Sequence, residues 1–419
     1  MIKAITGTKD ILPDEIQKWL FFEKLVREEM AFYNYQEIRT PVFEETALFA
    51  RSIGEATDIV SKEMYTFIDR SEVSITLKPE MTASVVRAFI EHSLGKKQGL
   101  NKLFYISPMF RQERPQAGRL RQFHQIGVEA IGSANPVLDA EMIIIAFKIL
   151  ERLGLKNLSV KINSLGIPES REKYKLLLAN YLQKYFEELS DDSKKRFHTN
   201  ILRIFDSKDE RDIQLMKNAP LLLEHLDNNS LLHFEQVRSI LTNLKLPYEI
   251  EPKLVRGLDY YTHTTFEIIS NSIGSQSALC GGGRYDLLIE QLGGEPTPGV
   301  GFAAGIERIL LACENEKLLN LSPKIIDIYI IRLEKELFTK IYEISHQLRE
   351  QGLSIEIDYL DRSVKAQMRE ANKLNAKYVI IIGGNEYKNN NFILKNMSNG
   401  EEKLFSADKI FELENIINE

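Results

Sequence analysis

The sequence predicts an α+β fold: an antiparallel sheet flanked by helices, with a helical insertion and a small C-terminal α/β domain. Three observations lead to this prediction. Residues 110–129 read FRQERPQAGRLRQFHQIGVE, with alternating apolar residues around a centre that holds Pro115 and Gly118. Such a pattern is typical of a strand, a long loop and an antiparallel strand. Residues from about 167 to 250 are helical in pattern, and residues 326–419 alternate between β and α patterns.

The individual elements follow from local patterns. In the body, amphipathic periodicity predicts helices at 14–33, 44–53, 82–93 and 136–153, and β-type runs predict strands at 37–43, 74–77, 103–106, 123–129, 158–162 and 264–269. A glycine-rich stretch runs from 281 to 305. Further on, strands at 327–331, 354–357 and 378–382 alternate with helices at 334–351 and 363–374, which is typical of a parallel-type sheet. We therefore predict two domains, 1–325 and 326–419, joined by a linker at 318–324.

The composition is that of an ordinary globular protein. Of the 419 residues, 43% are hydrophobic and 27% are charged. The formal net charge of -6 is no signature of nucleic-acid binding, so such a site would have to be a local basic patch. The only cysteines are Cys280 and Cys313, which excludes a disulfide framework and a cysteine-rich zinc site. There is no run of membrane-spanning length and no signal-peptide core, so we expect a cytoplasmic protein.

Several common catalytic motifs are absent. There is no G-x-x-x-x-G-K-[ST] phosphate loop, and Gly299, Gly301 and Gly305 do not have the spacing of a dinucleotide-binding turn. H-E-x-x-H, paired C-x-x-C and G-x-S-x-G are absent as well. A nucleotide would therefore have to be bound by arginines on an antiparallel sheet.

The predicted hairpin offers such arginines. Arg111, Arg114 and Arg119 lie near the strand ends, where guanidinium groups can pair bidentately with phosphate oxygens. A salt-bridged surface hairpin is the plainer alternative. Against it, Gln125 and Glu129 share one face of an otherwise apolar strand, and polar groups placed in that way usually meet a ligand or a partner.

Two further stretches carry unusual residues. Residues 254–267 read LVRGLDYYTHTTFE, and residues 280–288 read CGGGRYDLL. Taken singly, a tyrosine pair is usually part of a core and a glycine triplet is usually a turn.

Together these motifs resemble the histidyl-tRNA synthetases, a family of class II aminoacyl-tRNA synthetases. The likeness covers nearly the whole chain in the family's order. It includes GTKDILP at 7–13, the dimer motif around Thr40-Pro41, LKPEMTAS at 77–84, FRQERP at 110–115, LRIFDSK at 202–208, RGLDYY at 256–261, GGGRYD at 281–286 and GVGFAAGIERILL at 299–311. RGLDYY with GGGRYD is specific to the histidine enzymes, whereas the FRxE hairpin and the G-x-ER helix are shared across class II.

The resemblance implies an activity and its substrates. L-histidine would react with ATP to give histidyl-adenylate and pyrophosphate, and the histidyl group would then pass to the 3′ end of histidine tRNA. No protein nucleophile is needed, because catalysis would be positioning plus electrostatics. Mg²⁺ would accompany ATP by bridging its phosphates. The expected assembly is a homodimer with a class II catalytic domain at 1–325 and an anticodon-binding domain at 326–419.

The resemblance also assigns roles to residues. Arg111 would contact the α-phosphate and the amino-acid carboxylate, Glu113 the adenine amino group and Phe123 the adenine ring. Arg119 and Arg308 would hold the terminal phosphates, and Arg256 would stabilise charge at the α-phosphate. The remaining assignments are Glu80 with Thr82 and Gln125 for the α-ammonium, Glu129 and Tyr261 for the imidazole, Tyr260 and Tyr285 for the rest of that pocket, and Arg114 with Gln116 for the tRNA acceptor end.

Some residues depart from the family pattern or suggest rival interpretations. Met81, Leu287 and His263 stand where many relatives have glycine. His124 could be a general base, but a strand histidine that points away from Gln125 more often packs or forms a structural hydrogen bond. One rival is a regulatory subunit of ATP phosphoribosyltransferase, against which residues 326–419, Arg256 and the GIER helix argue. Another is a class II synthetase for proline or threonine, against which RGLDYY and the Gln125/Glu129 pair argue.

Overall fold

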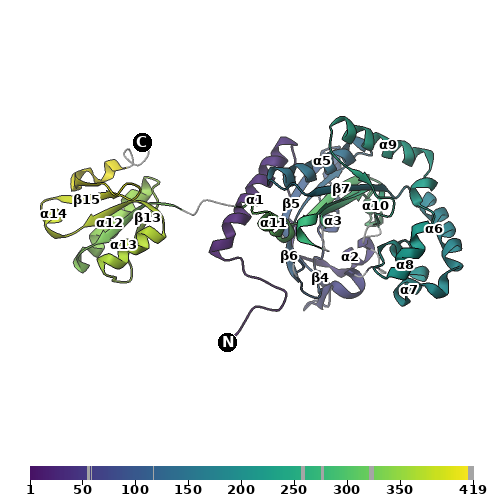
Figure 1. Ribbon diagram of the computed structural model, residues 1–419, viewed down its shortest axis with the longest axis horizontal. Helices are drawn as coiled ribbons and strands as arrows, with labels where there is room; N and C mark the ends of the chain where they lie inside the picture. Colours follow the sequence, from purple (N-terminus) through teal and green to yellow (C-terminus); the bar gives the residue numbers. More distant parts are fainter. Residues whose placement is uncertain are drawn as a thin grey trace. The chain divides into compact units, whose positions relative to one another are not determined.

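The computed structural model describes residues 1–53, 57, 59–116, 118–255, 260–274, 278–319 and 325–413. The chain forms two compact units, Met1–Asn320 and Leu321–Glu419, which are described separately below (Figure 1). The described helices include none that is long and apolar enough to cross a membrane.

The first unit is built on an eight-stranded sheet with the order β1-β5-β6-β11-β10-β9-β7-β8. The six central strands pair antiparallel, and the short edge strands β1 and β8 pair in parallel. The strands are β1 (Gln36–Glu37), β5 (Asn101–Phe110), β6 (Gln122–Ile131), β7 (Leu158–Ser164), β8 (Glu249–Ile250), β9 (Thr262–Ser270), β10 (Ala278–Arg284) and β11 (Gly299–Gly305). The predicted antiparallel sheet is confirmed, and the glycine-rich stretch contains two of its strands.

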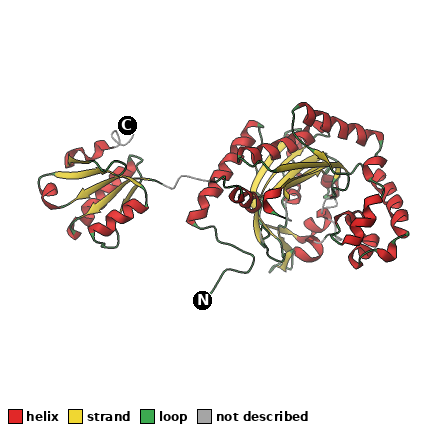
Figure 2. Cartoon of the chain, viewed as in Figure 1, coloured by secondary structure: helices red, strands yellow, loops and turns green. Residues whose placement is uncertain are grey.

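Alternation along β6 separates the two faces of this sheet. Ile126 and Val128 join the core formed with helices α1 (Pro13–Phe32), α5 (Pro136–Arg152), α9 (Asn228–Asn243) and α11 (Ile306–Asn315). Gln125 and Glu129 face the other way, because successive strand residues point to opposite faces. Figure 2 shows helices flanking the sheet. The face of β6 that carries polar side chains is therefore the one predicted from its pattern.

The helices begin where the sequence provides start signals. Helix α1 has Pro13 in its first turn with Asp14 and Glu15 after it, and acidic side chains there complement the helix dipole. Helix α5 has Pro136 in its first turn, and the Asn135 side chain accepts a hydrogen bond from the backbone N–H of Val137 at 3.0 Å. The predicted helix boundaries at 14–33 and 136–153 are thus correct to within a residue or two.

A smaller antiparallel sheet has the strand order β2-β4-β3 and packs against helix α2 (Thr46–Ile53), which in turn packs against α3 (Thr82–Glu91), the neighbour of α4 (Leu94–Lys97). Its strands are β2 (Phe43–Glu45), β3 (Tyr65–Ile68) and β4 (Ser74–Leu77). The prediction of one strand at 37–43 was wrong, because β1 belongs to the large sheet and β2 to the small one. Pro41 lies between them, and proline has no N–H to donate to a strand ladder.

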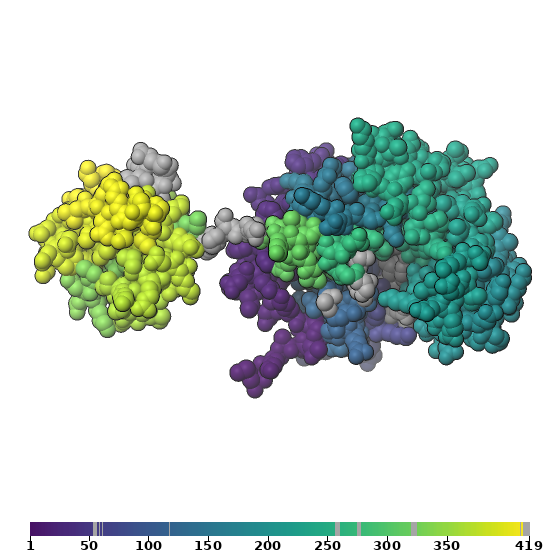
Figure 3. All heavy atoms as spheres, in the orientation of Figure 1, coloured from purple at the N-terminus to yellow at the C-terminus, as the bar shows by residue number. Residues whose placement is uncertain are grey.

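The insertion is helical, as predicted. Its helices are α6 (Pro168–Gln183), α7 (Asp191–Thr199) and α8 (Glu210–Leu215), followed by α9. Buried side chains of this region join those of α3 and of strand β5 in a second core on the opposite face of the sheet. Figure 3 shows the insertion, in teal, covering one side of the first unit.

The second unit has a five-stranded sheet with the order β13-β12-β14-β15-β16. Strands β12 (Ile326–Arg332), β13 (Ile355–Ile357) and β14 (Ala376–Ile382) are parallel, and β15 (Asn391–Asn396) and β16 (Glu402–Ser406) add an antiparallel hairpin. The helices are α12 (Phe338–Glu350), α13 (Val364–Lys373) and α14 (Gly384–Lys388). The parallel-type prediction holds for β12, β13 and β14 only. The hairpin was not predicted because its strands, NFILKN and EKLFS, mix apolar and polar residues and form no continuous apolar run.

Candidate active site

A cavity of about 570 Å³ lies on the face of the large sheet opposite helices α1 and α5. Most of the residues predicted for the site line it together. They are Glu80, Thr82, Arg111, Glu113, Arg119, Phe123, Gln125, Tyr260, Tyr261, Tyr285 and Arg308. Arg256 lies outside the described residues, so its predicted role stays a prediction.

Glu129 does not itself line this cavity but lies directly behind two residues that do, Thr82 and Tyr285. It is 1% exposed, and its two oxygens accept hydrogen bonds from the Thr82 hydroxyl at 2.8 Å and the Tyr285 hydroxyl at 2.5 Å. Burial, together with the nearby Glu80 charge, raises the pKa of Glu129 to about 8. A Cβ atom on Gly301 would come within 1.9 Å of Oε2 of Glu129, so only glycine leaves room for this carboxylate.

Glu80 lies at the start of helix α3. Its oxygens accept hydrogen bonds from the backbone N–H groups of Thr82 at 2.8 Å and Ala83 at 2.9 Å. Burial raises its pKa, although these N–H groups favour the ionised form. Thr82 therefore joins the two carboxylates, through its backbone to Glu80 and through its hydroxyl to Glu129. Two buried carboxyl groups beside one cavity suit a cationic or N–H-rich ligand, which would favour their ionised forms.

Two other polar atoms at this end have no partner. The Gln125 Oε1 atom and the Tyr105 hydroxyl are buried and make no hydrogen bond to the described residues. Tyr105 was not predicted as a site residue. It faces Gly127 across the β5–β6 ladder, and a Cβ there would lie 2.1 Å from the ring. In the predicted hairpin Tyr105 stands opposite Gly127, and this pairing was the signal that could have identified it.

Three tyrosines form an aromatic wall. The rings of Tyr260 and Tyr261 are 4.8 Å apart, and those of Tyr260 and Tyr285 are 6.0 Å apart in an edge arrangement. All three are at least 94% buried, and they line the cavity as well as the core. The glycine triplet that precedes Tyr285 lies within β10 and pairs with β9 and β11, so it is not a turn.

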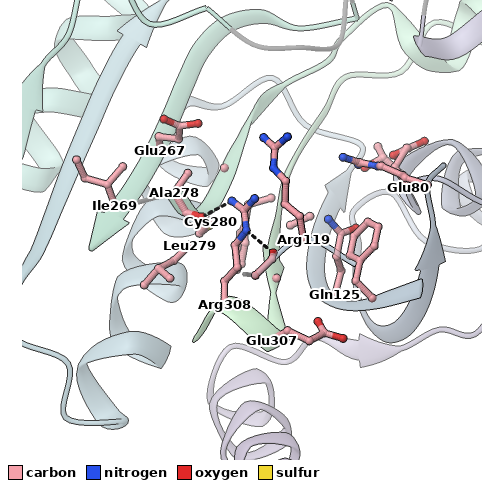
Figure 4. A pocket seen from close by; sticks show the side chains of 18 of the residues that line it. Glu80, Arg119, Gln125, Glu267, Ile269, Ala278, Leu279, Cys280, Glu307 and Arg308 are labelled. Atoms are coloured by element: carbon pink, nitrogen blue, oxygen red, sulfur yellow. Dashed lines mark hydrogen bonds between the residues drawn. The ribbon is translucent and has the colours of Figure 1, made fainter. Parts of the chain in front are cut away.

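The other end of the cavity is basic. Arg308 donates through Nε to the Gly118 carbonyl at 3.0 Å and through Nη1 to the Ala278 carbonyl at 2.9 Å. Burial and the nearby Arg119 charge lower the pKa of Arg308. In Figure 4 these two arginines lie between Glu267 on one side and the Gln125 end on the other. Two arginines held this close suit a polyanionic ligand.

Arg111 joins the two ends. Its Nε donates to the Pro79 carbonyl at 2.9 Å, and its guanidinium lies 5.2 Å from the centre of the Phe123 ring. Glu113 is 3.3 Å from Nη1 of Arg119. The Phe123 ring borders the cavity and can support a flat ring between these charged groups.

The cavity includes residues to which no role was assigned. Glu267 lines it from β9, and Asp206 and Lys208 line it from the insertion. Asp206 and Lys208 belong to the LRIFDSK motif, which was the available signal. Within the described residues, no group of three or more His, Cys, Asp or Glu side chains is arranged to hold a metal ion.

Arg114 and Gln116 do not line this cavity. Both side chains are exposed on the loop between β5 and β6, and Gln116 borders a second cavity of about 290 Å³. His124 also borders the second cavity, where its Nδ1 is 2.9 Å from Glu307 and its ring meets the edge of Trp19 at 4.9 Å. These contacts agree with a structural role for His124.

Comparison with known proteins decides the family. Residues 7–309 match the family described as histidyl-tRNA synthetase, and residues 327–414 match the anticodon binding domain. The chain belongs to the histidyl-tRNA synthetase family. It is 49% identical to the histidine–tRNA ligase of Caldanaerobacter subterraneus subsp. tengcongensis over 98% of both chains. It is 48% identical to that of Halothermothrix orenii over 99% of this chain and 100% of the relative.

A solved structure of the family supports the fold. The apo histidyl-tRNA synthetase of S. aureus is 40% identical, with a TM-score of 0.83 over 99% of each chain. The match spans both units. Membership of the histidine family also decides against a synthetase for proline or threonine.

Proposed function

We propose that this chain is a histidine–tRNA ligase, which activates histidine with ATP and transfers the histidyl group to histidine tRNA. The observation that carries the proposal is the polarity of one cavity. Glu80 lines one end, with buried Glu129 behind Thr82 and Tyr285, and Arg119 and Arg308 line the other end. Family membership and full-length identity support the same activity.

The histidine side chain and ammonium fit the acidic end. Glu129 would accept an imidazole N–H, and the unpartnered oxygen of Gln125 would accept from the α-ammonium beside Glu80. Tyr260 and Tyr261 would enclose the imidazole ring. An imidazole N–H would favour the ionised form of Glu129, and the charge-assisted hydrogen bond that results favours histidine over amino acids of similar size.

ATP fits the basic end. Phe123 would stack on adenine, Glu113 would accept from its amino group, and Arg119 and Arg308 would hold the terminal phosphates. Arg111 is then placed for both the α-phosphate and the histidine carboxylate. The carboxylate oxygen attacks the α-phosphorus, and pyrophosphate leaves. The residues supply positioning and charge stabilisation, to which Arg256 contributes by its motif.

The family uses ATP together with a divalent metal ion, and we propose Mg²⁺ as part of that substrate. Glu267 is a carboxylate on the wall of the cavity, and its charge acts on Arg308. One carboxylate plus phosphate oxygens suits Mg²⁺, which usually keeps several waters.

For tRNA, we propose that residues 1–325 form the catalytic domain and residues 326–419 the anticodon-binding domain. Exposed Arg114 and Gln116 would approach the acceptor end from the hairpin loop. The segment around Thr40 and Pro41 would form the interface of a homodimer, and the cytoplasm is where this activity is expected.

Pyrophosphate exchange with each standard amino acid tests the proposal. Only histidine should support rapid exchange of label into ATP, and the activated histidine should pass to histidine tRNA. Exchange with another amino acid, or no exchange with any, would overturn the proposed function.

A further inference from the structure

A buried ion pair lies behind the cavity, between helix α5 and strand β10. Arg284 and Asp139 are both 0% exposed. The Arg284 Nε donates to the two Asp139 oxygens at 3.2 and 3.0 Å, and Nη2 also donates to Oδ2. Its remaining N–H groups donate to the Ser133 carbonyl at 3.1 Å, the Asn135 carbonyl at 3.3 Å and the Asp286 carboxylate at 3.1 Å. The N–H groups of this guanidinium are therefore all used in hydrogen bonds to the surrounding chain.

The residue that it holds is Tyr285. Arg284 and Asp286 flank Tyr285, so their shared contact fixes the backbone on both sides of the tyrosine. The Tyr285 N–H donates to the Gly299 carbonyl at 2.7 Å, and the Tyr285 hydroxyl donates to Glu129 at 2.5 Å. A shift of this short segment would move the hydroxyl that orients the Glu129 carboxylate.

The same aspartate is linked through His233 to the segment that carries the tyrosine pair. The His233 Nε2 atom, from α9, is 3.0 Å from Asp139 Oδ1. The His233 ring stacks on that of His263, with centroids 4.8 Å apart and an interplanar angle of 17°. His263 follows Tyr261 by two residues and has a positive φ of 41°, a conformation that needs support from its neighbours. The link from Asp139 to the tyrosine pair is thus indirect, whereas its partner Arg284 immediately precedes Tyr285.

We propose that Asp139 and Arg284 form a positioning pair for histidine recognition, which rests on the function proposed above. Neither residue lines the cavity, so the pair acts through Tyr285 on Glu129. A buried ion pair is often no more stabilising than apolar residues of similar size. Its value here is geometric, because it holds the segment around Tyr285 by several directional hydrogen bonds.

The test measures KM for histidine and for ATP by pyrophosphate exchange in Asp139→Asn, Tyr285→Phe and the double variant. Loss of the aligned Tyr285 hydrogen bond should raise the histidine KM by about ten-fold or more, while the ATP KM changes little. If Asp139 acts through Tyr285, the double variant should resemble Tyr285→Phe alone. Glu29→Gln is the matched control, because Glu29 is also buried and pairs at 2.9 Å with Arg152 at the other end of α5.

Equal changes in both KM values for Asp139→Asn, or additive effects in the double variant, would overturn the pair's role. If Asp139→Asn does not fold, Asp286→Asn replaces it, because Asp286 is partly exposed and the Asp139 contact to Arg284 remains. It should raise the histidine KM selectively by a smaller factor, and an unchanged histidine KM would refute the inference. Failure of the unsubstituted protein to use histidine would refute the proposed function instead.

Discussion

Replacing Glu129 by glutamine should change how the stability of the first unit depends on pH. The pKa of Glu129 rises from 4.5 to about 8, because the folded protein buries the carboxyl group. Each pKa unit corresponds to about 1.4 kcal/mol. The preference of Glu129 for its neutral over its ionised form is therefore stronger by roughly 5 kcal/mol in the folded protein than in the unfolded chain. The Thr82 and Tyr285 hydroxyls already oppose this shift, which makes burial the dominant cause.

The sign of the effect follows from proton linkage. Between pH 4.5 and about 8, the folded protein keeps a proton on Glu129 that the unfolded chain has released. The stability contributed by this group is therefore fully present below pH 4.5 and is lost as the pH rises through about 8. Glutamine cannot ionise, so Glu129→Gln should lack this loss. Glu80 is also buried with a raised pKa and its charge acts on Glu129, so the difference between the two proteins includes the coupling of these two carboxyl groups.

Calorimetric unfolding of both proteins across this pH range measures the difference. The melting temperature of the unsubstituted protein should fall relative to the variant by on the order of 10 °C from the acidic to the alkaline limit. A pH-independent difference between the two proteins, or one of opposite sign, would refute the argument that burial controls the proton affinity of Glu129.

Three further predictions concern other parts of the molecule. Tyr105→Phe should raise the stability of the ligand-free protein by about 1 kcal/mol, because it removes a buried hydroxyl that has no hydrogen-bond partner in the described residues. It should weaken histidine binding if that hydroxyl contacts the substrate. Thermal unfolding with and without histidine measures both effects. Arg256→Ala should lower histidine-dependent pyrophosphate exchange by about a hundred-fold or more with little loss of ATP binding, and near-normal exchange would remove Arg256 from the mechanism. Deleting residues 326–419 should abolish most tRNA charging but leave adenylate formation measurable, and unchanged charging with the same anticodon dependence would contradict the assignment of that domain.

The sequence predicted those parts of the site whose geometry depends on local periodicity. Gln125 and Glu129 are four residues apart on one strand, so their common face follows from the two-residue period of a β-strand. Periodicity also predicted α1, α5 and the parallel strands β12, β13 and β14, but not the β15–β16 hairpin. Resemblance then gathered Glu80, Tyr285 and Arg308 into one site, which periodicity alone could not do because they are far apart in the chain.

Contacts between distant residues could not be predicted in this way. Asp139 and Arg284 are separated by 145 positions, and nothing near Asp139 distinguishes it from the acidic first-turn residues common in helices. The prediction of a single strand at 37–43 failed for a related reason, since short strands depend on the partners that tertiary structure supplies.

The glycines show how tertiary context reverses a local preference. A glycine within a strand normally weakens the strand, since it has no side chain to pack. In this sheet, Gly127 and Gly301 each face a large neighbour across the ladder, and an added Cβ would meet Tyr105 at 2.1 Å or Glu129 at 1.9 Å. The missing side chains leave space in which an aromatic ring and a carboxylate lie against the backbone. The absence of side chains at these two glycines therefore leaves the room for a cavity on one face of an otherwise continuous sheet.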